Sequence, residues 1–158
     1  MTISRRPRAQ WTATIDAVTD AVWTCPRCGA RLVTRNMWHS CGRHSLEELF
    51  PGDPARLALA QACVQLLAGL GDVQVLPQKT RLVCVARVRF AGLQPRRGAV
   101  LLSFALRRWP DSPRVGRRAE YAPGWRAHVV RLTDEDALDD ELRRWLQESH
   151  DTVGLQRG

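Results

Sequence analysis

The residues with the clearest chemical meaning are three cysteines and one histidine near the N-terminus. Cys25 and Cys28 are separated by two residues, and His39 and Cys41 follow after a gap. Two cysteines at this spacing let one tight turn point both thiolates the same way, and Gly29 lets backbone amides fold toward the sulfurs. Three sulfurs and one nitrogen form the tetrahedral set that zinc prefers in closed structural sites. The spacing therefore predicts one structural zinc ion.

Two alternatives to this ligand set arise from the same residues. A redox dithiol also has two cysteines two residues apart, but it normally opens a helix after a strand and needs no nearby His-x-Cys pair. His44 lies three residues after Cys41 and can compete with His39 for the fourth position. Cys41 and His44 would form a knuckle with the usual gap, whereas His39 and Cys41 require a tighter turn, so the spacing leaves both histidines open.

Charge is separated along the chain. The 158 residues carry 24 Lys and Arg against 16 Asp and Glu, a net charge of +8. Thirteen of the cations and only two acids lie in residues 73–132, whereas eight acids and two arginines lie in residues 133–151. The basic segment predicts a surface that attracts phosphate backbones in a salt-dependent way. The alternative is an arginine-rich surface that is simply solvated.

Lys79 and His128 are the other residues with distinctive chemistry. Lys79 is the single lysine among 24 cationic residues, which suggests a position that requires a compact, titratable ammonium. His128 can transfer protons near neutral pH. Placed together with Arg107 or Arg126, the two side chains would suit a bound phosphate or carboxylate. The alternative for His128 is a strand histidine that is satisfied by one hydrogen bond.

The chain that positions these residues is predicted to have four parts. Residues 1–21 are expected to be a basic arm or lead-in, and residues 22–50 a zinc-ribbon-like lobe with two short strands around the cysteine turn. Residues 51–150 are expected to form an α+β domain, and residues 151–158 a frayed tail.

Capping residues predict two helices in the larger domain. Asp53 is a suitable N-cap, Pro54 suits the first helical position and Gly71 suits the end, so a helix is predicted over residues 54–70. Thr133, followed by three acids, predicts the start of a final helix with an apolar stripe.

Alternating apolar residues predict three or four antiparallel strands between these helices. The predicted strands cover residues 80–90, 99–108 and 126–132, with arginines on the outer face of the first. Cys63 and Cys84 lie on apolar sides and are predicted to be core residues. Residues 110–124, rich in Pro, Gly and Arg, are expected to be a long mobile loop. The expected fold class is α+β.

Targeting features point to the cytoplasm. The most apolar segment, residues 57–70, is too short to cross a bilayer. The N-terminal arginines are not followed by an apolar run, which argues against a secretory signal. Five cysteines, three of them at zinc-binding spacing, suit a reducing compartment.

Four short motifs connect the chain to a known family. They are WTCPRCG at 23–29, NMWHSCG at 36–42, PQKT at 77–80 and LDDEL at 138–142. Together they resemble small bacterial proteins known only as domain of unknown function 5655, over roughly residues 22–149. In that family the histidine of the second motif accompanies the cysteines, so the resemblance implies His39 as the zinc ligand. It implies a fold rather than an activity.

We consider three hypotheses of function. The first is a zinc-stabilised, non-enzymatic module that binds RNA or DNA through an arginine-rich face and the 110–124 loop. The second is a small-anion pocket protein or enzyme centred on Lys79 and His128, and the third is a protein-interaction adaptor whose acidic helix and basic middle neutralise each other. No nucleophile elbow, phosphate-cradling glycine loop or paired-carboxylate motif occurs. The arginines expected to contact phosphates are Arg81, Arg87, Arg89, Arg96, Arg97, Arg107, Arg108, Arg117 and Arg118.

Overall fold

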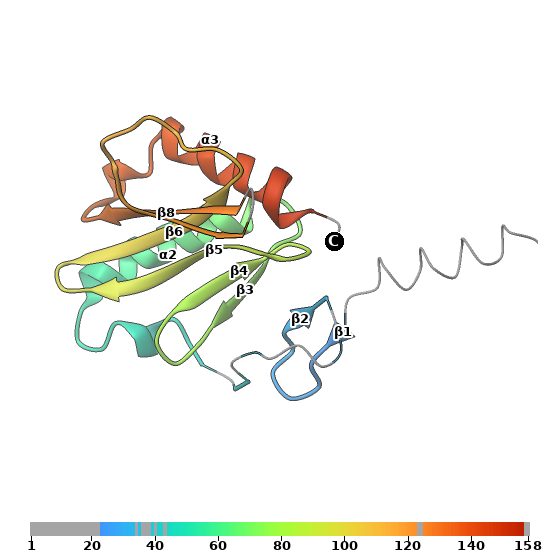
Figure 1. Ribbon diagram of the computed structural model, residues 1–158. Coiled ribbons are helices and arrows are strands. Elements are labelled where there is room, and N and C mark those ends of the chain that lie inside the picture. The colour runs from blue at the N-terminus through green and yellow to red at the C-terminus, as the bar shows by residue number, and fades with distance from the viewer. Residues whose placement is uncertain are drawn as a thin grey trace, which may run out of the picture.

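The computed structural model describes residues 23–33, 35, 39, 41–42, 44–122 and 125–156. Within these ranges the chain forms a small two-stranded lobe, then a six-stranded antiparallel sheet with helices packed against it (Figure 1). The predicted basic arm, residues 1–21, lies outside the described residues. No described helix is long and apolar enough to cross a membrane.

The lobe contains β1 (Trp23–Thr24) and β2 (Arg31–Leu32). The strands of the large sheet are β3 (Gln74–Pro77), β4 (Leu82–Val85), β5 (Arg89–Arg96), β6 (Ala99–Leu106), β7 (Val115–Ala122) and β8 (Trp125–Leu132). They lie in the order β3-β4-β5-β6-β8-β7. The helices are α2 (Pro54–Ala68) and α3 (Asp140–Ser149), with 3₁₀ turns at Glu47–Leu49 and Glu135–Ala137 and a π-helical turn at His150–Gly154.

The mixed helix and sheet architecture is confirmed, but the sheet is larger than the three or four strands predicted. The predicted strand over residues 80–90 is two strands, because the chain turns after β4 and the alternating pattern continues through that turn. The expected mobile loop over residues 110–124 contains β7, which pairs with β8 and forms the edge of the sheet among the described residues. An edge strand needs few apolar residues, so its arginine-rich composition concealed it.

Helix α2 begins as predicted. The Asp53 side chain accepts a hydrogen bond from the Arg56 amide at 3.0 Å, and Pro54 occupies the first helical position. The helix ends at Ala68, two residues before the predicted end.

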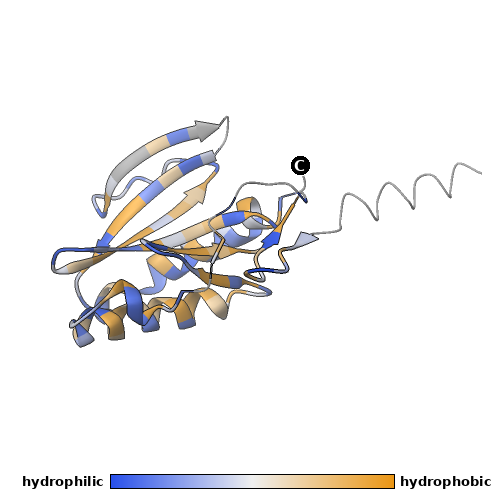
Figure 2. Cartoon of the chain, turned by 90° about the horizontal axis from the view of Figure 1, so that it is seen from below, coloured by the Kyte–Doolittle hydropathy of each residue, from blue (hydrophilic) through white to orange (hydrophobic). Residues whose placement is uncertain are grey.

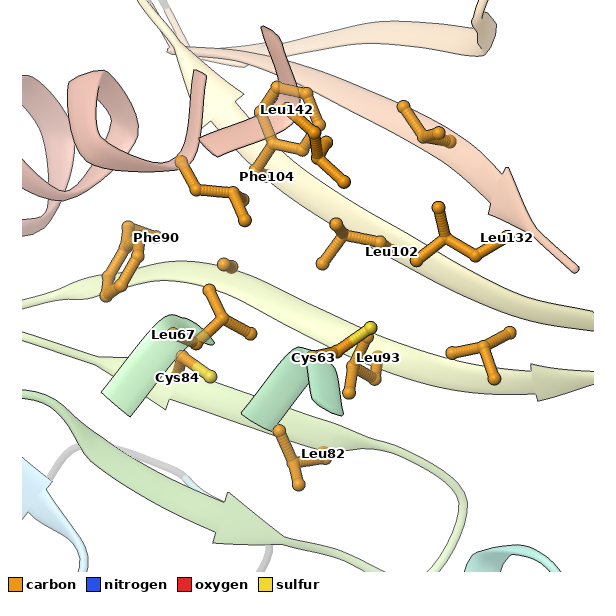
Figure 3. Packing of buried hydrophobic residues seen from close by; sticks show 14 of the residues in the cluster. Cys63, Leu67, Leu82, Cys84, Phe90, Leu93, Leu102, Phe104, Leu132 and Leu142 are labelled. Carbon is orange, nitrogen blue, oxygen red and sulfur yellow. The ribbon is translucent and has the colours of Figure 1, made fainter. Parts of the chain in front are cut away.

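Strand register fixes which side chains form the core. Cross-strand pairing aligns Leu82 with Leu93 and Leu93 with Leu102, and all three are almost fully buried. They pack against α2 residues such as Cys63 (Figure 3). Phe104 stacks on Trp145 of α3 at a ring distance of 5.9 Å, so both helices pack on the same face of the sheet. The view in Figure 2 shows α2 along one side of the sheet.

The C-terminal region differs from the prediction in two ways. Helix α3 is capped by Asp139, which accepts a hydrogen bond from the Leu142 amide at 3.0 Å, and not by Thr133. The acids at 134–136 and at 139–141 both resemble a helix start. Only the second group directly precedes the buried apolar side chains of α3. The prediction of a frayed tail is also wrong. Val153 is fully buried, and the Gly154 carbonyl accepts hydrogen bonds from two backbone amides of the β4–β5 turn.

Truncating Val153 should therefore destabilise the fold. We expect Val153→Ala to lower the free energy of unfolding by about 2 kcal/mol, because it removes buried methyl groups and leaves a cavity. Leu155→Ala is the matched control, since Leu155 is 49% exposed and its truncation should have little effect. Urea unfolding followed by circular dichroism measures both. Equal stabilities of the two variants would contradict the assigned role of this segment.

Candidate functional site

Cys25, Cys28, His39 and Cys41 lie together in the lobe. Their candidate ligand atoms all lie within 4.8 Å of one another, so the cluster can hold a metal ion. The sulfurs of Cys25 and Cys41 are 3.8 Å apart. A tetrahedral zinc with bonds of about 2.3 Å to each sulfur would place two sulfurs about 3.8 Å apart. The donor set and this distance both fit zinc.

The turn between β1 and β2 positions the first two cysteines. The Cys25 amide donates to the Ala30 carbonyl at 2.9 Å, and the Gly29 amide donates to the Cys25 carbonyl at 2.8 Å. Gly29 has φ of 77°, a left-handed conformation that glycine adopts without strain. Because this turn joins two strands and opens no helix, it lacks the usual setting of a redox dithiol.

Electrostatics within the cluster favour a bound cation. Burial raises the pKa of the Cys25 thiol, but hydrogen bonds from the Cys28 and Arg27 amides outweigh it and lower that pKa to about 6. Burial, with Cys25 and Cys28 as neighbours, raises the pKa of Cys41 to about 11. Three sulfurs this close cannot all become thiolates unless a positive charge lies among them.

The two candidate histidines have different surroundings. His39 belongs to the cluster and lies edge-on to Trp23 at a ring distance of 6.5 Å. His44 Nδ1 lies 3.0 Å from Glu48 Oε2, and the residue is not part of the cluster. The geometry therefore supports His39 as the fourth ligand.

The remaining cysteines are core residues. Cys63 is 1% exposed and Cys84 is fully buried. Burial raises the pKa of both thiols to about 12, which keeps them protonated and unreactive.

The amide side chain of Gln74 connects the lobe to the sheet. Gln74 of β3 accepts a hydrogen bond from the Arg31 amide at 2.7 Å and donates to the Gly29 carbonyl at 2.6 Å. Arg31 also forms an ion pair with Asp72 at 3.0 Å. Gln74 lies opposite Val85 in the register, on the face of the sheet away from the helices. The lobe therefore covers β3 and β4 on that second face.

A cavity of about 480 Å³ lies on the same face beyond the lobe. Small side chains make its floor, because Gly92 pairs with Ser103 and Ala105 pairs with Ala127. A Cβ at Gly92 would lie 2.7 Å from the Leu82 carbonyl oxygen, so this position excludes any side chain. No described helix covers this part of the sheet.

Arginine and aromatic side chains border the cavity. Arg81 and Arg89 line it and also line a smaller hollow of about 180 Å³ between the lobe and the sheet. Arg81 Nε donates to Gln78 Oε1 at 3.3 Å. An added Cβ at Gly92 would lie 3.6 Å from both Arg89 Nη2 and Ser103 Oγ, so the guanidinium lies over the floor. Trp125 also lines the cavity.

Other predicted phosphate contacts are used within the fold. Arg107 donates to the Thr152 carbonyl at 3.0 Å and to Gln156 at 3.0 Å. Arg108 forms a two-pronged ion pair with Glu148 at 2.8 and 2.9 Å. Part of the basic segment therefore binds the C-terminal region.

Three of the remaining predicted arginines, Arg87, Arg96 and Arg97, do not line the cavity. Arg87 lies in the β4–β5 turn, where its backbone amide donates to the Gly154 carbonyl at 2.8 Å. Arg96 and Arg97 are exposed at the β5–β6 hairpin. Arg117 and Arg118 lie in β7, but their side chains lie outside the described part of the chain.

Lys79 and His128 are not brought together. Lys79 is exposed in the β3–β4 turn, whereas His128 is fully buried on the helix-covered face, stacked on Phe104 at 5.5 Å. Strands β5 and β6 lie between β4 and the strand of His128. A single anion site centred on both residues is not formed.

Four positions at this site escaped the sequence analysis: Gln74, Gly92, Ser103 and Trp125. Ser103 is the single polar residue of β6, and Gly92 interrupts β5, which is a signal for close backbone approach. Gln74 and Trp125 left no comparable signal, because their roles depend on which segments meet in space.

Comparison with known proteins gives one match. A family model described as Domain of unknown function (DUF5655) matches residues 47–153, about two thirds of the chain. The matched range contains the sheet and both helices and leaves out the Cys/His cluster. No curated protein and no solved structure matches the chain.

The two histidines provide a test of the metal centre. We expect the purified protein to contain one metal ion per chain, His39→Ala to lose most of it and His44→Ala to retain it. Elemental analysis after dialysis measures this content. Retention of full metal content by His39→Ala would exclude the proposed ligand set.

Proposed function

The chain belongs to the family described as Domain of unknown function (DUF5655), and we propose that this member is a zinc-stabilised, non-enzymatic module that binds nucleic acid on the uncovered part of its sheet. The observation that carries the proposal is the pair Arg81 and Arg89 on the border of a sheet-face cavity. Guanidinium groups bind phosphate oxygens through two parallel hydrogen bonds, and an arginine pair suits a phosphate backbone.

The charge distribution supports the choice of partner. The net charge is +8, and the acids of the C-terminal region are partly neutralised within the fold by Arg108 and Arg114. Arg108 and Arg107 therefore contribute less than the sequence predicts, and the binding surface is centred on Arg81 and Arg89. Positive surfaces of this kind attract nucleic acid with an affinity that falls as salt rises.

Zinc has a structural role in this proposal. Cys25, Cys28, His39 and Cys41 would hold the ion, and the ion would neutralise the thiolates and fix the β1–β2 turn. Because Gln74 connects that turn to β3, the metal also keeps the lobe beside Arg81 and Arg89.

Charge removal on the cavity border should weaken nucleic-acid binding. We expect the double variant Arg81→Gln/Arg89→Gln to bind single strands at least about tenfold more weakly, and to reduce the slope of log K against log salt by about 1.4. Arg143→Gln/Arg144→Gln on exposed positions of α3 removes the same charge and should change binding little. Fluorescence anisotropy with RNA and DNA oligonucleotides over a salt series measures both. Absence of binding at low salt, or equal losses in the two variants, would exclude the proposal.

Zinc affinity should rise with pH. The pKa of the Cys41 thiol is raised to about 11, so in the metal-free protein this thiol is protonated at neutral pH and zinc must displace the proton. The pKa of Cys25 is lowered to about 6, so its proton competes only below about that pH. We expect the apparent association constant to increase at least about tenfold per pH unit between about pH 6.5 and 8. Competition with a chromophoric chelator measures this slope, and a pH-independent constant would contradict the ligand set.

A further inference from the structure

The cavity on the sheet face has the dimensions and lining of a ligand site. Its volume of about 480 Å³ lies within the range of about 300–1,000 Å³ that is usual for small-ligand pockets. The hollow exists because the residues at its centre have small side chains, whereas those at its border are larger. The small residues are Gly92, Ser103, Ala105 and Ala127. A flat charged surface for polyanion binding would not need such a recess.

The two ends of the cavity differ in chemistry. At one end, Arg89 Nη2 and Ser103 Oγ lie near the same point above Gly92, and Arg81 lines the same hollow. These are donors for phosphate oxygens or a sugar hydroxyl. The other residues of the lining include Trp125, Ala119 and Ala127, which offer an aromatic ring and apolar contacts to a base.

We infer that this cavity is a subsite for one unpaired nucleotide of a single strand, with its phosphate at Arg81 and Arg89 and its base over the alanine floor beside Trp125. This inference rests on the proposed function and adds the form of nucleic acid that is bound. A base in a duplex is paired and stacked, so it cannot enter a recess in a protein surface, whereas an unpaired base can.

The zinc lobe lies next to this subsite. Arg81 and Arg89 line both the cavity and the hollow against Cys28 and His39, so the lobe limits where the two guanidinium groups can lie. The same lobe buries Val83 and Val85, the apolar residues of β4 on this face. The nucleotide site is therefore confined to the part of the face that the lobe leaves uncovered.

A variant that fills the floor without changing charge tests the inference. Ala127→Leu adds three carbon atoms to the cavity, and Ala58→Leu on the exposed side of α2 is the matched control. Labelled oligouridylate and oligothymidylate of about twelve nucleotides, and a duplex of the same length, serve as probes. Thermal unfolding of each variant establishes that it is folded.

We expect the single strands to bind at least about tenfold more tightly than the duplex at equal salt. Ala127→Leu should weaken single-strand binding by about tenfold with an unchanged salt slope, and Ala58→Leu should have no effect. Competition by adenosine or thymidine monophosphate at millimolar concentration would further support the subsite, and the two oligonucleotides distinguish RNA from DNA.

The outcomes separate this inference from the proposed function. Salt-sensitive binding that is equal for duplex and single strand, and unaffected by Ala127→Leu, would overturn the nucleotide subsite and leave the nucleic-acid proposal standing. If the oligonucleotides bind no more tightly than the monophosphates, the ligand of the cavity is a free nucleotide and not a single strand, and the inference is overturned. Failure of every nucleic acid to bind at low salt would overturn both.

Discussion

The two-residue side-chain period of the central strands is the constraint on which the rest of the molecule depends. In β4, β5, β6 and β8 one set of alternate residues, which includes Leu82, Leu93, Leu102 and Leu132, forms the core with α2 and α3. The other set includes the small residues Gly92, Ser103 and Ala127, which lie in adjoining rows. A shift of one residue in any strand would exchange these sets, so core packing also fixes the second face.

The second face is then divided by the Cys/His lobe. A lobe of this size has little apolar surface of its own, so contacts with the larger domain stabilise it, and a metal ion held by the cluster would stabilise it further. The Gln74 amide supplies two hydrogen bonds to the lobe backbone, and Arg31 adds an ion pair with Asp72. The lobe covers β3 and β4 and leaves the cavity over β5, β6 and β8 accessible among the described residues.

Several arginines form ion pairs within the fold and are therefore not part of the candidate binding surface. Arg114 contacts Asp139 at 2.8 Å and Glu141 at 3.3 Å, and its guanidinium lies 5.9 Å from the Trp145 ring centre. Arg108 and Glu148 connect the end of β6 to α3. Ion pairs between the basic segment and the acidic C-terminal segment thus help to hold α3 against the sheet. Among the other arginines, Arg81 and Arg89 line the cavity, and Arg96 and Arg97 are exposed at the β5–β6 hairpin.

Local patterns in the sequence determined the ligand cluster, the α2 cap and the mixed helix and sheet class, because turn spacing, capping and periodicity act over a few residues. They could not decide the number of strands, since β7 is an edge strand and the β4–β5 turn preserves the alternation. They also could not decide which face His128 occupies. Only tertiary packing separated Lys79 from His128 and brought Arg81, Arg89 and Trp125 around one cavity, because cross-strand register joins residues that lie far apart in the chain.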